Sequence, residues 1–171
     1  MKRFLLSILA ATFCAFSVDA KVVLTEDFSA FSAGSDTAPD MSNIMSDFTG
    51  LTQTPGWSGM YVCQAGGSAY LPAGSNLVTP ALDLSGGGGS FVVTFRAKSE
   101  ASPAMVIMSD MYMSAMGFVE ITNEWKEYSI TLNNGASNYQ IAIQALYNDF
   151  YIDDIDTKYS ICNRWPGKWN K

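Results

Sequence analysis

Apolar and polar residues alternate with a period of two through most of the chain beyond residue 20, and this pattern constrains the fold most. In the clearest run, Phe91, Val93, Phe95 and Ala97 alternate with mostly polar neighbours. Successive side chains of a strand point to opposite faces of a sheet, so the pattern predicts half-buried strands. Residues 21–171 contain no long pattern with the 3.6-residue helical period. The predicted strands cover residues 22–28, 57–64, 68–72, 76–80, 91–98, 103–109, 116–121, 125–132, 139–146 and 149–156.

The segments between the strands carry turn residues. The glycine run at 85–90 predicts a flexible connection that does not pack, and the Asn-Asn-Gly sequence at 133–135 predicts a hairpin with positive φ. Residues 32–56 are rich in Ser, Asp, Thr and Pro, which predicts a long excursion with one helical turn near residues 40–47. Many short strands without crossover helices predict an all-β fold, an antiparallel sandwich or barrel.

The first twenty residues have the pattern of a secretory signal peptide. Lys2 and Arg3 precede an apolar stretch at 4–16, and the small residues at 17–20 resemble a cleavage site after Ala20. The apolar stretch is shorter than the roughly 20 residues that a transmembrane helix needs. We therefore expect a secreted protein, periplasmic or extracellular, without a transmembrane segment. A lipid anchor on the cysteine at position 14 and an uncleaved membrane anchor are the alternatives.

Cleavage would leave two cysteines, Cys63 and Cys162, and the sequence does not decide whether they pair. It would also leave eight basic and fifteen acidic residues, a net charge of −7 compared with −6 for the whole chain. An acidic protein without a basic face is not expected to bind nucleic acid.

The composition also restricts catalysis, because the 171 residues include no histidine. Ser-His-Asp and Cys-His nucleophiles and His-ligated zinc are therefore excluded. Glycoside hydrolysis by paired carboxylates is an alternative that needs no histidine. Glu120, Glu124 and Glu127 form an acidic cluster, but their spacing suits a helix and they lie where strands are expected. We therefore expect a protein that is not an enzyme.

Two acidic residues continue the apolar faces of the first and last strands. Glu26 follows Val22 and Leu24 at intervals of two, and Asp154 follows Ile152. Facing carboxylates suggest Ca²⁺, which takes about 6–8 oxygen ligands, with Asp153 as a neighbouring contributor. The alternative is that these acids end their strands in solvent.

Short motifs follow one another from the start of the domain to its end. They begin with Leu-Thr-Glu-Asp-Phe and finish with Phe-Tyr-Ile-Asp-Asp-Ile, and they lie at residues 24–28, 55–57, 64–67, 77–84, 123–128 and 150–155. In order and spacing these motifs resemble the choice-of-anchor J type of jelly-roll domain. The resemblance implies an exported, non-catalytic jelly-roll β-sandwich of the kind found in secreted bacterial surface proteins. It also implies a structural Ca²⁺ where the first and last strands meet, held by Glu26 and Asp154, with Asp153 less certain. The chain then divides into a signal peptide at 1–20, the sandwich at 21–157 and a poorly ordered basic tail at 158–171.

Binding of carbohydrate or of a cell surface is the expected function, because exposed aromatic rings stack on sugar rings. Tyr112 and Tyr147 lie in expected loops and are the candidate ligand-binding residues, with Trp57 as a third. The alternative is a structural or adhesion domain that binds a surface protein. Thr37, in the sequence Asp-Thr-Ala, resembles a bacterial O-glycosylation site.

Overall fold

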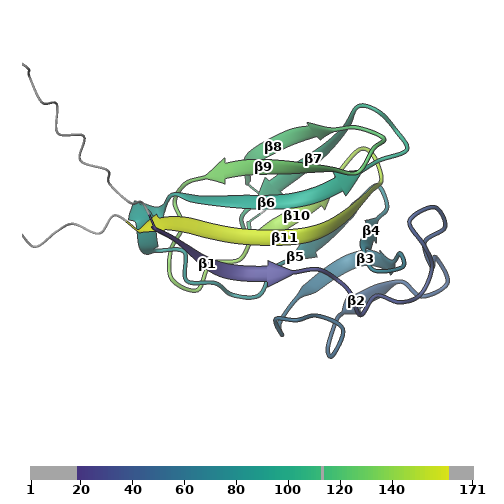
Figure 1. The fold of residues 1–171 in the computed structure, drawn as a ribbon, viewed down its shortest axis with the longest axis horizontal. Helices are drawn as coiled ribbons and strands as arrows, with labels where there is room; N and C mark the ends of the chain where they lie inside the picture. The colour runs from purple at the N-terminus through teal and green to yellow at the C-terminus, as the bar shows by residue number, and fades with distance from the viewer. Residues whose placement is uncertain (1–18, 113, 162–171) are drawn as a thin grey trace, which may run out of the picture.

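The computed structural model describes residues 19–112 and 114–161, which form eleven strands and one short 3₁₀ helix (Figure 1). The residues expected to form the signal peptide lie outside this range, apart from Asp19 and Ala20. No helix in the part of the chain that the structure describes is long and apolar enough to cross a membrane. The elements are β1 (Asp19–Glu26), β2 (Met45–Asp47), β3 (Ser58–Gln64), β4 (Ala69–Leu71), β5 (Ser75–Val78), η1 (Gly86–Gly89), β6 (Phe91–Lys98), β7 (Ala104–Ser109), β8 (Ala115–Ile121), β9 (Lys126–Leu132), β10 (Ala142–Ala145) and β11 (Phe150–Ile161).

The strands form two antiparallel sheets that pack face to face, so the predicted sandwich is confirmed. In the first sheet β11 lies between β6 and the pair β1 and β4, and β9 borders β6. The second sheet has the order β8-β7-β10-β5-β3, with β2 beside β3. Strand β3 belongs to both sheets, because its first half pairs with β5 and its last two residues pair with β4.

The alternation of apolar residues places the core between the two sheets. Phe91, Val93, Phe95 and Ala97 of β6 are all buried, as the period of two predicts. Facing residues of the second sheet, such as Met108, complete the core. Burial of each large apolar side chain contributes about 1.5–3 kcal/mol, so this alternation is the main source of stability.

The excursion between β1 and β3 closes one end of the sandwich with aromatic rings. Phe28, Phe31 and Phe48 are fully buried, and the ring centroids of Phe31 lie 5.0 Å from Phe28 and 5.8 Å from Phe48. The expected helical turn at 40–47 is wrong, because Met45–Asp47 form β2. A three-residue strand is too short to show a period in the sequence.

Two connections differ from the sequence-based expectation. The glycine run is not an unpacked linker: Gly86 lies against the ring of Tyr159, and a Cβ there would overlap that ring. The domain also continues past residue 157, because Lys158–Ile161 complete β11 and pair with β1. The period of two is interrupted before these residues by a bulge, which hid them from the sequence pattern. Residues 162–171 of the expected tail lie outside the described range.

Candidate functional site

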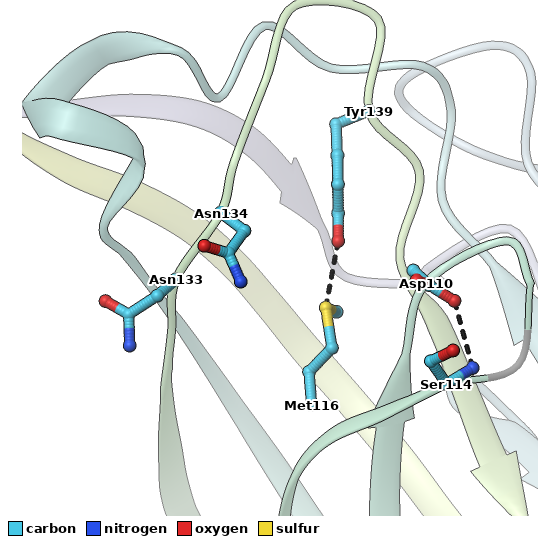
Figure 2. Close-up of a pocket in the computed structure, with 6 residues that line it drawn as sticks. All are labelled: Asp110, Ser114, Met116, Asn133, Asn134 and Tyr139. Carbon is cyan, nitrogen blue, oxygen red and sulfur yellow. Dashed lines mark hydrogen bonds between the residues drawn. The ribbon is translucent and has the colours of Figure 1, made fainter.

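A hollow of about 500 Å³ opens where β7 and β9 end and β8 begins, near the start of β10 (Figure 2). Its lining comes from two segments that are far apart in the sequence, one after β7 and one after β9. A second hollow of about 210 Å³ adjoins it and shares Asp110 and Tyr139. The residues that line one or both hollows are Asp110, Met111, Tyr112, Ser114, Met116, Asn133, Asn134, Asn138, Tyr139 and Gln140.

Asp110 fixes the turn that follows β7. Its Oδ1 accepts hydrogen bonds from the backbone N–H groups of Tyr112 and Ser114, both at 2.9 Å. Short Asp side chains commonly stabilise turns in this way. The turn holds Tyr112 with 90% of its surface exposed. A large ring is therefore presented to solvent on an ordered backbone.

Tyr139 forms one wall of the hollow and is fixed from two sides. Its backbone pairs with Leu82 at 2.7 and 2.8 Å, and its ring meets the ring of Phe91 edge to face at 6.1 Å. Its hydroxyl donates to Met116 Sδ at 2.9 Å (Figure 2). Burial, together with the charge of Asp110, raises the pKa of Tyr139, so the hydroxyl stays protonated. Met116 reaches this hydroxyl because a β-bulge interrupts the register between β7 and β8.

The opposite wall is made by two amides. Asn133 and Asn134 follow β9, and Asn134 has a φ of +69°, as the Asn-Asn-Gly sequence predicts. The next residue, Gly135, donates its backbone N–H to the carbonyl of Gly89 at 2.8 Å. This segment crosses to the other sheet, so it is a connection between the layers rather than the expected hairpin.

The chemistry of the two hollows is polar and almost uncharged. Their lining includes amides, hydroxyls and two tyrosine rings, and Asp110 is the charged residue among the described lining residues. Amide and hydroxyl groups both donate and accept hydrogen bonds. The arrangement therefore suits a ligand that carries many hydroxyl groups.

The structure separates the three aromatic residues that the sequence singled out. Tyr147 is 74% exposed but follows β10, whereas Tyr112 lies beside the residues that precede this strand. The two rings are therefore at opposite ends of β10. Trp57 is 3% exposed and meets Phe28 edge to face at 5.6 Å. The interpretation of Trp57 as a ligand residue is wrong, because its large apolar ring is used in the core.

Thr37 lies on a tight turn that is attached to the outer face of the first sheet. Ser35 and Ala38 exchange backbone hydrogen bonds across this turn, and Thr37 is exposed. Asp36 accepts from Trp125 Nε1 at 3.3 Å and pairs with Lys98 at 3.5 Å. Glycosylation of Thr37 stays a prediction.

Glu26 points into the protein, as the alternation predicts, and is 1% exposed. Its Oε1 accepts the N–H of Phe28 at 3.1 Å, and its Oε2 accepts those of Gln53 at 2.9 Å and Thr54 at 3.4 Å. Burial raises the pKa of Glu26, while these hydrogen bonds oppose the rise. The three N–H groups point their partially positive hydrogens at the carboxylate oxygens, where they would repel a cation. The Glu26 carboxylate is therefore placed to accept backbone hydrogen bonds and not to bind Ca²⁺.

Asp154 does not face Glu26. The register of β11 against β6 shifts between Asp153 and Asp156, and Asp154 has a φ of +49°. The bulge turns Asp154 to solvent, where it pairs with Arg96 at 3.3 Å. The expected inward orientation of Asp154 is wrong for this reason, because one inserted residue reverses the face of a side chain.

Asp153 is half-buried beside this bulge, and burial together with neighbouring acids raises its pKa to about 6. Among the described residues, no three acidic, cysteine or histidine side chains are grouped so that they could hold a metal ion. The described side chains therefore do not assemble the expected calcium site.

The three glutamates of the hydrolase alternative are exposed and do not converge. Glu120 of β8 pairs with Met105 in the second sheet, whereas Glu127 of β9 pairs with Arg96 in the first sheet. Their strands belong to different layers of the sandwich, and both side chains face away from the core. This arrangement lacks the facing pair of carboxylates that glycoside hydrolysis requires.

Several solved structures are similar to this chain. A two-module structure of the Clostridium thermocellum xylanase Xyn10B, CBM22-1 with GH10 and complexed with xylohexaose, matches with a TM-score of 0.51 at 14% identity, over 81% of this chain and 28% of that chain. The carbohydrate-binding module CBM6cm-2 from Cellvibrio mixtus lichenase 5A, in complex with cellotriose, gives 0.49 at 14% identity, over 80% and 97%. The C-terminal CBM6 of LamC from Zobellia galactanivorans gives 0.48 at 14% identity, over 79% and 98%.

No protein-family model and no curated protein matches the sequence. The structural match to the xylanase shows the β-sandwich fold. Membership in the narrower choice-of-anchor J family stays a prediction.

Proposed function

We propose that this chain is an exported, non-catalytic carbohydrate-binding module and that the two adjoining hollows are its binding site. The observation that carries the proposal is the position of Tyr112, which is 90% exposed on the turn that Asp110 holds beside the hollows. The fold shared with the module-containing xylanase structure supports the proposal.

The lining residues have the two properties that a sugar requires. The ring of Tyr112 provides a flat apolar surface for the axial hydrogens of a pyranose, and amides provide hydrogen bonds to its hydroxyls. Asp110 uses Oδ1 for its turn, which leaves Oδ2 to accept from a ligand hydroxyl. Because the turn is already ordered, binding does not have to pay for fixing the loop.

Binding without catalysis follows from the separated acids. Asp110 stands without a second carboxylate among the described residues that line the hollows. A bound glycan would therefore be held and released unchanged. Incubation of the protein with the glycan that it binds, followed by analysis for shortened products, should detect none.

The test compares two exposed tyrosines. Retention on insoluble xylan, cellulose and laminarin, followed by titration calorimetry with the soluble oligosaccharides, measures binding. Tyr112→Ala should weaken binding at least about tenfold, equivalent to about 1.4 kcal/mol. Tyr147→Ala removes a ring that is also largely exposed, at 74%, but lies at the other end of β10, and it should leave the affinity unchanged.

Two results would contradict the proposal. Absence of binding across a broad panel of neutral and charged glycans would exclude carbohydrate as the ligand and favour a protein partner. Equal loss of affinity in the Tyr112 and Tyr147 variants would show that the hollows are not the site. Melting curves of both variants establish that they are folded.

Export is part of this proposal and has its own measurement. The structure places Asp19 and Ala20 in β1, where they pair with Ile161 and Ser160. Cleavage after Ala20 would remove these first two residues of the strand and leave the remaining pairs intact. The N-terminal sequence of the protein recovered outside the cytoplasm should begin at Lys21.

A further inference from the structure

The two sheets end in four edge strands within the described part of the chain, and three of these edges are protected. Strand β2 has only three residues and includes Asp47. Strand β1 carries Lys21 and is interrupted by a bulge, and β9 begins with Lys126 and Glu127. Short length, charge and bulges are the usual features that stop a sheet edge from pairing with another chain.

The fourth edge, β8, lacks most of this protection. It pairs with β7 on one side and forms the border of the second sheet on the other (Figure 1). Its seven residues, Ala-Met-Gly-Phe-Val-Glu-Ile, include one charged side chain and no proline. After a bulge near its start, the register against β7 is regular from Gly117 to Ile121. Such an edge presents a row of backbone N–H and C=O groups to a further strand.

The ring of Phe118 stands in solvent at the middle of this edge. A Cβ on Gly117 would meet Ile130 Cγ2 at 2.7 Å, so Gly117 faces the core, and Ile121 is fully buried. Phe118 follows Gly117 and therefore takes the opposite face. Its side chain is 65% exposed. The edge that is open to pairing thus also presents a large apolar side chain.

We propose that two copies of this chain pair through β8, antiparallel, with Phe118 of one copy opposite Phe118 of the other. This register is symmetric, as a two-fold dimer requires. It sets the two rings as a cross-strand pair, with their Cβ atoms about 4.5–5.5 Å apart. The hydrogen-bonded ladder of the second sheet then continues from one copy into the other. This pairing goes beyond the proposed function and does not depend on carbohydrate.

Charge favours this edge and this register. The chain has a net charge of −6, so two copies repel each other where their acids meet. Strand β8 brings one acid, Glu120, to the contact. With Phe118 opposite itself, the two Glu120 side chains are offset by four residues, or about 14 Å along the strands, which exceeds the Debye length of about 8 Å at physiological ionic strength. A register with Val119 opposite itself would halve this offset.

The dimer would also place the second copy beside the candidate site. Met116 lines the larger hollow, and in this register it lies opposite Glu120 of the second copy. Two hollows in one assembly retain a polymeric ligand better than a single hollow does. Because the contact is short, we expect a reversible dimer whose fraction rises with protein concentration.

Sedimentation velocity of the purified protein from about 1 to 500 μM measures the association, and the wild type should shift from monomer toward dimer over this range. Phe118→Lys should weaken the dimer at least about tenfold, because it removes both rings and sets two ammonium groups opposite each other. Val22→Lys is the matched control, since Val22 is 54% exposed on the edge strand β1 and the change in net charge is the same. It should leave the dimer intact. Melting curves establish that both variants are folded.

A cysteine cross-link tests the register. Phe118→Cys and Glu120→Cys each place a thiol on the outward side of β8, in a Cys162→Ser background, while the native Cys63 is buried. A disulfide needs Cβ atoms about 3.5–4.5 Å apart, a distance that the proposed register approaches at position 118 and not at position 120. On air oxidation Phe118→Cys should give a covalent dimer, and Glu120→Cys should not.

Three results would overturn this inference. A wild type that is monomeric over the whole concentration range would exclude the dimer. Equal weakening by Phe118→Lys and Val22→Lys would show that β8 is not the interface. Cross-linking of Glu120→Cys as fast as that of Phe118→Cys would exclude the register. None of these measurements involves a glycan, so failure here leaves the proposed function intact.

Discussion

Glu26→Gln tests whether the buried carboxylate of Glu26 stabilises the fold by accepting hydrogen bonds from backbone N–H groups. The variant keeps the size of the side chain but replaces one oxygen with an NH₂ group. That group must face either the N–H of Phe28 or those of Gln53 and Thr54, which now contact Oε1 and Oε2. A buried N–H without an acceptor costs about 1–3 kcal/mol. Removing a charge whose pKa is raised by burial returns part of this energy, so we expect a net loss of about 1–2 kcal/mol.

The assay is urea unfolding, followed by tryptophan fluorescence, in EGTA and again in excess Ca²⁺. A loss of this size corresponds to a melting temperature lower by about 2–8 °C in a domain of this length. Glu127→Gln is the matched control, because Glu127 is exposed on β9, and it should change the stability little. We expect the same loss for Glu26→Gln in both buffers, since the hydrogen bonds do not require a metal.

Two results would refute this reasoning. If Ca²⁺ at about 100 times its Kd stabilised the wild type by about 2.7 kcal/mol, and Glu26→Gln abolished that gain, Glu26 would be a metal ligand. If the variant were as stable as the wild type in EGTA, the three hydrogen bonds would contribute no net stability.

Three further predictions concern stability. Burial raises the folded-state pKa of Asp153 from 3.8 to about 6, so the wild type should lose stability as the pH rises from about 4 to 6. This shift in pKa corresponds to a change in the free energy of unfolding of at most about 3 kcal/mol, which the partial exposure of Asp153 reduces to about 1–2 kcal/mol. In urea unfolding curves measured across this pH range, Asp153→Asn should remove most of the change in stability. Gly86→Ala should cost about 1–3 kcal/mol in thermal unfolding, because the new Cβ overlaps the ring of Tyr159; wild-type stability would contradict the packed glycine turn. Trp57→Phe should cost less than the usual loss of a buried tryptophan, since Trp57 Nε1 has no hydrogen-bond partner among the residues that the structure describes, and a calorimetric loss above about 4 kcal/mol would contradict this.

The alternation of apolar residues predicted the strands well because each strand is buried on one face. The prediction failed where a bulge interrupts the alternation of side chains between the two faces of a strand, and where a strand is too short to show the alternation. At Asp154 the bulge inserts one residue and reverses the side chain, an event that a period of two cannot show. The predicted strand 139–146 is shorter in the structure, because Tyr139 pairs with Leu82 outside the ladder of β10.

The candidate site was only partly predictable. Loop position identified Tyr112, and the Asn-Asn-Gly sequence marked the turn that contributes Asn133 and Asn134. Asp110 and Tyr139 gave no signal of their own, because their roles depend on two segments that meet through the tertiary fold. The one available clue to Asp110 was its position after a predicted strand, where a short acidic side chain commonly holds a turn.

The pairing of β1 with β11 determines how the domain should respond to mechanical force. Asp19 pairs with Ile161, and the two strands run antiparallel from that point, so the two ends of the described domain lie side by side (Figure 1). Hydrogen bonds of an antiparallel pair lie perpendicular to the strands. A force that pulls these two ends apart would therefore break the hydrogen bonds between β1 and β11 one after another. The first strand should peel away at low force, while the rest of the sandwich, including the hollow beside β7, is still folded.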